Sequence, residues 1–425
     1  MCGLTGFWQH NGCAAEEAAA TARRMADTLV HRGPDDAGVW VDEAAGLALG
    51  HRRLAILDLS AAGHQPMVSA SGRFVVAFNG EIYNHLALRQ QLAAQGAVPP
   101  WRGHSDTETL LAAIEVWGVE ATLKELVGMF ALALWDRETR TLVLARDRMG
   151  EKPLYYGWQG GVFLFGSELK ALRAHPAFVG EIDRDALALF LRHNYIPTPL
   201  CIYRGLYKLR PGAYLRLTEG DVATGSTPRP QAYWSVRQAA QDGQSHPFAG
   251  SDAEAAQALD ALLRQAIQGQ MLADVPLGAF LSGGVDSSTV VALMQAQSSR
   301  PVKTFTIGFH EQDYNEAEHA HAVAAHLGCE HTELYVTPTQ AMAVIPRLPT
   351  LYDEPFADSS QIPTFLVAQL AREHVTVSLS GDGGDELFGG YNRYFWTRRI
   401  WDLSLIHISE PTRLLSISYA VFCLK

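Results

Sequence analysis

The second residue of the chain, Cys2, is a candidate nucleophile. The sequence begins Met1-Cys2-Gly3, and a small second residue lets the initiator methionine be removed, which would make Cys2 the N-terminal residue. A free α-amine has a pKa of about 7.7–8.0 and a thiol one of about 8.5, so one residue would carry both a nucleophile and its base. Position alone favours an ordinary residue near a chain end, and only the motifs that accompany Cys2 favour a nucleophile.

Two glycine-rich segments in the second half of the chain predict a phosphate site. The segment GAFLSGGVDSS (278–288) ends a predicted strand and begins a predicted helix, where backbone N–H groups and the helix dipole attract anions. The lysine-containing pattern of the common phosphate loop is absent. The segment LSGDGGDELFGGYNRY (379–394) also follows a predicted strand. Ligands bind beyond the carboxyl ends of the strands in a doubly wound sheet, so both segments are expected to face one crevice.

The first half of the chain, residues 1–225, reads mostly as strands with a few helices. Strand-forming runs cover 47–59 and 73–83, and residues 129–147 form two apolar runs around a charged turn, which predicts a hairpin. Residues 105–118 begin with a Ser-Asp cap and carry one apolar helical stripe. These patterns predict an antiparallel sheet layer flanked by helices.

The second half alternates between helices and strands. Residues 226–252 lack sustained periodicity and predict a linker with at most local structure. Beyond it the pattern predicts helices and strands in turn: 253–272, 276–282, a helix from Ser287, 303–309, 315–327, 331–337, 360–373 and 375–380. Such alternation predicts an α/β domain with a doubly wound parallel sheet over residues 253–402.

Four ordered motifs join the initial MCG: HRGPDD (31–36), HRRLAILD (51–58), FNGEIYNH (78–85) and HSDTE (104–108). Together they resemble the glutaminase domain of class II glutamine amidotransferases. The SGGVDSS segment resembles the pyrophosphate loop of the ATP pyrophosphatases. The motifs reach about Tyr394, and the chain as a whole is similar to the glutamine-hydrolysing asparagine synthetase family. The resemblance implies an N-terminal-nucleophile αββα sandwich for residues 1–225, followed by an incomplete ATP-pyrophosphatase domain.

The resemblance assigns roles in the glutaminase half. Cys2 would attack the side-chain amide of glutamine and release ammonia from a tetrahedral intermediate. The side chain of Asn79 and the backbone N–H of Gly80 would form the oxyanion hole.

The same resemblance implies residues that bind the α-carboxylate and the α-ammonium group of glutamine. Arg53 would hold the α-carboxylate by a two-pronged contact, and Glu81 and Asp106 would hold the α-ammonium. Taken alone, Arg53 also fits a surface ion pair and Asp106 a helix cap.

In the second half, the resemblance implies an ATP site with magnesium. Asp286 and Asp385 would be the Mg²⁺ ligands, which suits the oxygen ligands and retained waters of that ion. Asp382 stands where the family often has an acidic residue near the reacting amide, a candidate proton acceptor. The implied ATP contacts are Leu281, Ser282, Gly283, Gly284, Asp286, Ser287, Ser288, Ile307, Ser380 and Gly381.

Composition limits the other classes of function. A net charge of −11 disfavours a general nucleic-acid binder, which usually has a basic surface. The five cysteines form no CxxC pair, and the N-terminus has no apolar leader, so we expect a cytoplasmic protein. No apolar run reaches the roughly 20 residues of a spanning helix, so no membrane partner is expected.

The reaction implied is ATP-dependent amide formation in two linked sites. Glutamine would supply ammonia, and ATP would activate a carboxylate as an acyl-adenylate, with aspartate giving asparagine. Two alternatives stay open: amidation of another carboxylate, such as a sugar acid or a peptide, and a degenerate relative acting as a binding protein. The intact Cys2, Asn79, Asp286 and Asp385 count against the binding protein. A homodimer is also left open.

The last 23 residues differ from the rest of the chain. From Leu403 onward there is no glycine and only one alanine, Ala420, whereas the preceding residues are dense in both. The string LSLIHISEPTRLLSISYAVFCLK resembles the in-frame translation of a sequencing-library adapter. We therefore expect natural sequence to end near Trp401 or Asp402, with 403–425 a non-native tail and the synthetase half truncated.

Overall fold

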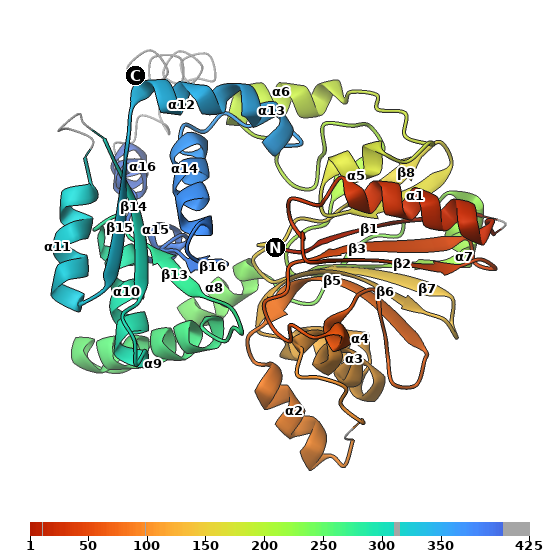
Figure 1. Ribbon diagram of the computed structural model, residues 1–425, viewed down its shortest axis with the longest axis horizontal. Coiled ribbons are helices and arrows are strands. Elements are labelled where there is room, and N and C mark those ends of the chain that lie inside the picture. The colour runs from red at the N-terminus through yellow and green to blue at the C-terminus, as the bar shows by residue number, and fades with distance from the viewer. Residues whose placement is uncertain (11, 98, 310–314, 403–425) are drawn as a thin grey trace. The chain divides into compact units, whose positions relative to one another are not determined.

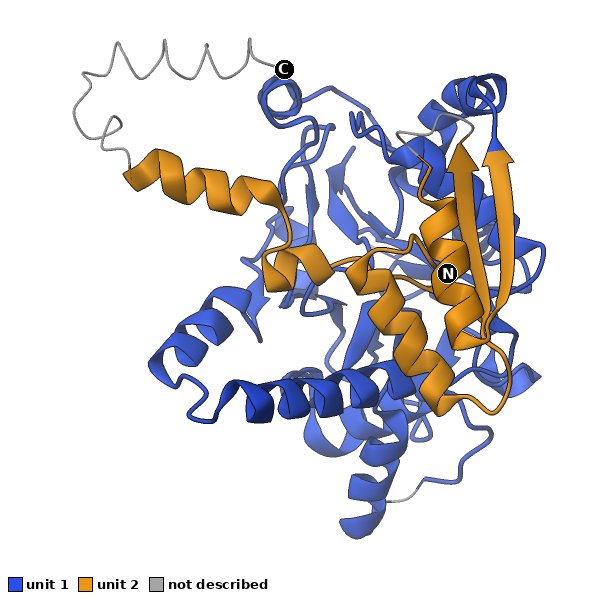
Figure 2. Ribbon diagram, turned by 90° about the vertical axis from the view of Figure 1, so that its left-hand side faces the viewer, with its two compact units in different colours: residues 1–277, 336–377 blue, residues 278–335, 378–425 orange. Residues whose placement is uncertain are grey.

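The computed structural model describes residues 1–10, 12–97, 99–309 and 315–402. The chain divides into two compact units (Figure 2): unit 1 is Met1–Leu277 with Val336–Val377, and unit 2 is Gly278–Tyr335 with the described part of Ser378–Lys425. The expected foreign tail, 403–425, lies outside the described residues, so its origin stays a prediction. Among the described residues, no helix combines the length and the apolarity needed to cross a membrane.

Unit 1 contains two six-stranded sheets. All strand pairs for which a register is given in these sheets are antiparallel, as the sequence predicted. The first sheet runs in the order β10 (Leu206–Lys208), β8 (Tyr155–Gln159), β9 (Val162–Gly166), β1 (Gly3–Trp8), β3 (Leu47–Arg53) and β2 (Asp36–Asp42). The second runs β12 (Gln231–Ala232), β11 (Ala213–Thr218), β7 (Thr141–Arg146), β6 (Gly128–Asp136), β5 (Phe74–Ile82) and β4 (Met67–Val68).

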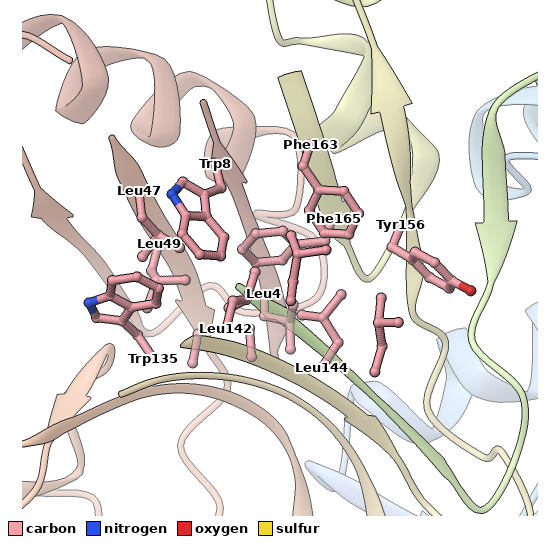
Figure 3. Close-up of a cluster of buried hydrophobic side chains, with 14 of the residues drawn as sticks. Leu4, Trp8, Leu47, Leu49, Trp135, Leu142, Leu144, Tyr156, Phe163 and Phe165 are labelled. Atoms are coloured by element: carbon pink, nitrogen blue, oxygen red, sulfur yellow. The ribbon is translucent and has the colours of Figure 1, made fainter. Parts of the chain in front are cut away.

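The main core lies between the two sheets (Figure 3). Trp8 of β1 meets Trp135 of β6 edge to face, with ring centroids 4.9 Å apart. Leu47 and Leu49 of β3 and Leu142 of β7 belong to the same buried cluster. Edge-to-face pairs of large rings add to the burial of apolar area. This core holds the start of β1, and therefore Cys2, against the second sheet.

Strand β5 is buried on both faces, which explains its continuous apolar run. Val75 and Ala77 point into the core between the sheets. Phe74, Val76 and Phe78 point the other way, into a cluster shared with α3 (Asp106–Trp117). Side chains alternate between the two faces of a strand, so a strand covered on both sides needs apolar residues at nearly every position. The polar Asn79 and Glu81 of β5 are the exceptions.

Helices cover the outer faces of both sheets, giving the expected αββα sandwich (Figure 1). Helix α1 (Ala15–Asp27) packs on β1, β2 and β3, and α3 packs on β5. Further helices of unit 1 are α2 (His85–Ala94), α4 (Val119–Glu125), α5 (Leu169–Arg173), α6 (Arg184–His193), α7 (Glu219–Thr224), α8 (Val236–Ser245), α9 (Asp252–Gln270), α12 (Pro338–Val344), α13 (Leu348–Leu351) and α14 (Gln361–Arg372).

The segment expected to be a linker, 226–252, contains regular structure. Strand β12 pairs with β11, and the buried Tyr233 donates its hydroxyl to the Arg146 carbonyl at 2.8 Å. Helix α8 follows. The second sheet therefore extends past residue 225, while the division of the chain into domains stays a prediction.

Unit 2 is built on a four-stranded sheet in the order β15 (Glu330–Val336), β14 (Lys303–Phe309), β13 (Leu277–Phe280) and β16 (Val377–Leu379). Strands β13 and β14 are parallel and are joined through α10 (Val285–Gln297), as the alternating pattern predicted. The remaining helices of this unit are α11 (Ala317–Leu327), α15 (Gly384–Phe388) and α16 (Asn392–Asp402). The strand order reverses between β13 and β16, and such a switch point is where open α/β sheets bind ligands.

Candidate functional site

The residues predicted to bind glutamine converge on one cavity of about 50 Å³ in unit 1. They arrive from four places: the residue before β1, the last residue of β3, the strand β5 and the first residue of α3. The cavity is lined by Cys2, Arg53, Asn79, Gly80, Glu81 and Asp106, together with Met1, Leu54, Ile56, Leu57, Gly63, Gln65, Phe78, Ser105, Thr107, Met129 and Lys152. The fold thus brings together predicted residues as far apart in the sequence as Cys2 and Asp106.

The Cys2 thiol lies at the edge of the cavity beside the backbone of Leu54. Its Sγ is 3.4 Å from the Leu54 nitrogen and 3.6 Å from the Leu54 oxygen. Burial raises the pKa of the Cys2 thiol, so it needs a nearby base to become a thiolate. Burial also lowers the pKa of the neighbouring terminal amine of Met1 to about 5, which leaves that amine uncharged and able to accept a proton at neutral pH.

The side chain of Met1 fills space beside the nucleophile. Its Sδ lies 3.1 Å from Lys152 Nζ and 3.8 Å from Arg32 Nη2. Since a water needs roughly 10–15 Å³ of accessible volume, the remaining cavity has room for a few waters. Removal of Met1 by hydrolysis of its peptide bond would enlarge the cavity and leave Cys2 with a free α-amine.

Asn79 is fully buried and faces the cavity with an unpaired amide. Neither its Nδ2 nor its Oδ1 has a hydrogen-bond partner among the described residues. A buried amide without a partner is unfavourable by about 1–3 kcal/mol, so such groups usually have a ligand or a water to bind. Its position on the wall beside Cys2 suits an oxygen that becomes negatively charged during attack.

The backbone of β5 offers a second donor at Gly80. The Phe78 N–H donates to Gln65 Oε1 at 2.6 Å, on the side of β5 away from β6. The Ile82 N–H donates to the Asp106 carboxylate at 2.9 Å on the same side. Gly80 lies between them, and backbone direction repeats every two residues, so its N–H also points away from β6, toward the cavity that Gly80 lines.

Arg53 is a buried cation held by backbone oxygens. Its guanidinium donates to the carbonyls of Ser60 at 3.1 Å and Leu57 at 3.2 Å, and also to that of Asp58. No carboxylate forms an ion pair with it among the residues that the structure describes. Because carbonyl dipoles do not cancel its charge, Arg53 remains free to bind an anionic group of a ligand.

Glu81 and Asp106 form a pair of buried carboxyl groups. Asp106 accepts the N–H groups of Ile82 at 2.9 Å and Thr107 at 2.7 Å. Burial, followed by the charge of Asp106, raises the pKa of Glu81 to about 7, and Glu81 Oε1 has no partner among the described residues. Neither carboxyl group forms an ion pair within the described part of the chain, and two neighbouring carboxyl groups suit an ammonium group.

Lys152 is a cavity residue that the sequence did not single out. Lys152 is buried on the cavity wall, and burial lowers the pKa of its ammonium. The turn before it is fixed by Asp147, whose carboxylate accepts the N–H groups of Gly150 at 2.6 Å and Lys152 at 3.0 Å. Lys152 and Pro153 lie in the turn between β7 and β8, and nothing else in the sequence marks this lysine.

Residues near Lys152 in the sequence contact a later segment of unit 1. The contact joins Tyr155 and residues 166–172 to residues 353–354. The Leu169 N–H donates to Asp353 at 2.6 Å, and the Tyr155 hydroxyl lies 3.5 Å from Glu354. The Glu354 carboxylate also forms an ion pair of 2.5 Å with Lys208.

In unit 2, the two glycine-rich segments meet where β13 and β16 lie side by side. Helix α10 begins after Gly284 without a side-chain cap, so the N–H groups of its first turn are open to an anion. A Cβ on Gly381 would lie 2.7 Å from the Ser287 nitrogen, which shows how closely the second segment approaches this helix start. Ser288 Oγ is buried with no partner among the described residues.

The predicted acidic residues cluster at the same place. A Cβ on Gly384 would lie 2.5 Å from the Asp286 carboxylate, which puts Asp286 beside the residue preceding Asp385. Asp382 accepts a hydrogen bond of 3.0 Å from the Ser380 hydroxyl and is exposed. Leu281 is buried at the end of β13, and Ile307 lies on the adjacent β14.

These residues fit a magnesium ion that is shared with a nucleotide. Among the described residues, no group of three or more His, Cys, Asp or Glu side chains could hold a metal. Mg²⁺ commonly takes only one or two protein carboxylates and completes its shell with phosphate oxygens and waters. Asp286 and Asp385 supply that number, and the open helix start beside them can accept the phosphates.

The fold and the two sites define a class II glutamine amidotransferase domain joined to an α/β domain. Comparison with protein families agrees: residues 1–234 match the glutamine amidotransferase domain model, and residues 258–416 match the asparagine synthase model. A solved glutamine phosphoribosylpyrophosphate amidotransferase of Bacillus subtilis is 18% identical, with a TM-score of 0.40, over 80% of this chain and 70% of that chain. That likeness is too weak to bear on the fold.

Curated relatives identify the family. A Mycobacterium tuberculosis protein named for glutamine-hydrolyzing asparagine synthetase is 40% identical over 93% of this chain and 61% of its own length. "Asparagine synthetase (glutamine-hydrolyzing) 1" of Bacillus subtilis is 36% identical over 93% and 59%. A Methanocaldococcus jannaschii protein named for the same synthetase is 34% identical over 92% and 76%. The chain belongs to the glutamine-hydrolysing asparagine synthetase family, and it spans about three fifths of the length of the first two relatives.

Proposed function

We propose that this protein makes an amide from a carboxylate, using glutamine as the nitrogen donor and ATP as the activating substrate, with aspartate converted to asparagine. Membership of the asparagine synthetase family supports the reaction class. The observation that carries the proposal is the cavity in unit 1. It is lined by the Cys2 thiol and by the buried amide of Asn79, which has no hydrogen-bond partner among the described residues. The Arg53 guanidinium and the carboxyl groups of Glu81 and Asp106 line the same cavity.

The glutaminase half-reaction follows from this arrangement. Glutamine binds with its α-carboxylate on Arg53 and its α-ammonium between Glu81 and Asp106. Its side-chain amide then lies toward Cys2, whose thiolate forms a bond to the amide carbon. The carbonyl oxygen takes the negative charge and is stabilised by Asn79 Nδ2 and by the N–H of the next residue. Collapse of the tetrahedral intermediate expels ammonia, and water then releases glutamate from the thioester.

The proton balance of this step favours an N-terminal cysteine. Burial lowers the pKa of the Met1 amine, the group that now precedes Cys2, to about 5, so this amine is uncharged at neutral pH. With Met1 removed, the amine of Cys2 takes the thiol proton and returns it to the departing ammonia. Removal of Met1 also clears the space that the methionine side chain occupies beside Lys152.

The second half-reaction belongs to the switch point of unit 2. When bound, Mg²⁺ would supply charge neutralisation to the phosphates of ATP. Asp286 and Asp385 would hold that ion, and the open N–H groups at the start of α10 would hold the pyrophosphate end. The remaining predicted contacts would surround the nucleotide: Leu281, Ser282, Gly283, Gly284, Ser287, Ser288, Ile307, Ser380 and Gly381. Asp382, exposed beside the loop, would accept the proton lost by ammonia on attack.

Two substitutions of free thiols test the glutaminase assignment. In Cys2→Ala, glutamine hydrolysis should fall by about a thousandfold or more, because no other group can form the thioester. Ammonia-dependent amide formation should survive. In the matched control Cys13→Ala, which removes a half-buried thiol outside the cavity, both activities should remain.

Glutamate release from glutamine and pyrophosphate release from ATP would be measured separately. Hydrolysis that persists in Cys2→Ala would contradict the assignment of the nucleophile. Loss of ammonia-dependent synthesis together with hydrolysis would contradict two separate sites. Pyrophosphate release that does not respond to aspartate would exclude aspartate as the acceptor and favour another carboxylate.

A further inference from the structure

The glutamine cavity of unit 1 is supported by a residue from outside the amidotransferase segment. Asp274 lies in the region matched by the asparagine synthase model, 40 residues after the amidotransferase match ends at 234. Within unit 1, its N–H donates to the Ile56 carbonyl at 2.9 Å. Its carboxylate accepts the Asp58 N–H at 2.7 Å and contacts His104 Nε2 at 2.6 Å. Asp274 therefore contacts the loop after β3 at two points, Ile56 and Asp58, and the segment before α3 at one, His104.

That loop is the one that holds Arg53. The carbonyls of Leu57, Asp58 and Ser60 are the acceptors of the Arg53 guanidinium. Asp58 adopts a positive φ of 59°, which is uncommon for a residue other than glycine and persists only where its surroundings fix it. The hydrogen bond from the Asp58 N–H to Asp274 is one of the contacts that fix it.

Asp58 also connects the loop that binds Arg53 to the segment that leads to Asp106. Its buried carboxylate accepts the Ser60 hydroxyl at 2.5 Å on one side and the His104 N–H at 2.9 Å on the other. His104 lies two residues before Asp106, a predicted ligand of the α-ammonium. The loop that orients Arg53 and the segment that leads into α3 are thus tied through one carboxylate.

We infer that Asp274 is a positioning residue for glutamine binding: it holds the loop 57–60, and through it the Arg53 guanidinium, in register with the segment that carries Asp106. The inference rests on the proposed glutaminase function. It predicts that the synthase-type segment contributes to glutamine affinity through Asp274. The contact with the exposed His104 imidazole is the weaker of the two side-chain contacts, because solvent reaches it. The backbone hydrogen bond to Asp58 is the stronger.

Substitution of Asp274 should weaken binding of the α-amino and α-carboxylate groups of glutamine and leave the reactivity of the Cys2 thiol unchanged. In Asp274→Ala, we expect KM for glutamine to rise by about 5- to 30-fold, because one charge-assisted hydrogen bond to the loop is lost. The value of kcat should stay within about twofold, because Arg53 binds substrate and transition state alike. Asp274→Asn retains an oxygen acceptor at the same place and should recover most of the affinity.

Two thiol reagents distinguish a positioning role of Asp274 from a general disordering of the cavity in Asp274→Ala. A diazoketone analogue of glutamine carries the α-amino and α-carboxylate groups, whereas iodoacetamide carries neither. In Asp274→Ala, alkylation of Cys2 by the analogue should slow, and alkylation by iodoacetamide should not. The control is Asp260→Ala on α9, which removes an exposed carboxylate paired only with Arg264. Slowing with both reagents, or with neither, would overturn the inference.

Hydrogen exchange provides a readout that does not depend on activity. In the full chain, amides of residues 54–60 should exchange faster in Asp274→Ala than in wild type or Asp260→Ala. If wild type hydrolyses no glutamine and does not react with the analogue, the proposed function fails, yet faster exchange would still support the structural contact. Unchanged exchange over 54–60 would overturn the inference whatever the activity.

Discussion

The carboxyl group of Glu81 gives the glutamine site its own dependence on pH. Burial and the charge of Asp106 raise the pKa of Glu81 to about 7, so the group is half protonated near neutral pH when the cavity is empty. The α-ammonium of glutamine binds the ionised form. Binding therefore releases a proton from Glu81, and it strengthens as the pH rises through about 7.

Measurement of KM for glutamine as a function of pH tests this role of Glu81. For wild type, KM for glutamine should fall by about tenfold between about pH 6 and about pH 8, as Glu81 ionises. Glu81→Gln should have a high KM that changes little over that range. Glu125→Gln, an exposed residue at the end of α4, should behave as wild type. The same tenfold fall in Glu81→Gln would contradict the role given to this carboxyl group.

The cavity residues differ in how well the sequence alone could predict them. The six residues of the glutamine site stand in dense local motifs, and the structure brings all of them to one cavity. Lys152 and Asp274 carry no such signal, because each acts through a contact that only the folded chain creates. Their partners lie 151 and 216 positions away, respectively.

At the level of elements, the close approach of the two glycine-rich segments is set by glycine. Gly384 begins α15, and a Cβ there would lie 2.5 Å from the Asp286 carboxylate. A helix accepts alanine readily, so Gly384→Ala should leave the helix intact and force the Asp286 side chain aside. The substitution moves one predicted magnesium ligand without removing it.

We predict that Gly384→Ala separates the two half-reactions. Pyrophosphate release should fall by about 10- to 100-fold, because a misplaced ligand costs orientation at the reacting phosphate. Glutamine hydrolysis should stay within about twofold of wild type. The control is Gly243→Ala in α8, where no atom lies within 4 Å of the added carbon. Normal pyrophosphate release in Gly384→Ala would contradict the placement of Asp286 beside Gly384.

Periodicity predicted most of the elements, within a few residues at their ends. Helix α3 was expected over 105–118 and spans Asp106–Trp117, and the hairpin expected over 129–147 is β6 and β7. The segment 226–252 was harder because β12 has only two residues and α8 has no buried side chain, so neither leaves a strong apolar pattern. The second antiparallel sheet came from the family resemblance, since a strand pattern does not say which sheet a strand joins.

At the level of the whole molecule, unit 1 includes a segment from the second half of the chain. Residues 336–377 belong to it, and the Glu354 carboxylate accepts the Ile202 N–H at 2.8 Å and pairs with Lys208 at 2.5 Å. Together with Asp274, this segment joins the synthase-type region to the amidotransferase sheets. Family motifs could not predict that residues 336–377 belong to unit 1, because each motif marks one site and says nothing of how distant segments pack.

Transfer of nitrogen from glutamine to the acceptor tests the central proposal most directly. The full chain would be supplied with ATP, Mg²⁺, aspartate and glutamine labelled isotopically at its side-chain nitrogen. Mass spectrometry would then follow the label. The proposed function predicts labelled asparagine in step with pyrophosphate, with no labelled product from Cys2→Ala. Label that leaves only as free ammonia, with no asparagine and no aspartate-dependent pyrophosphate, would contradict it.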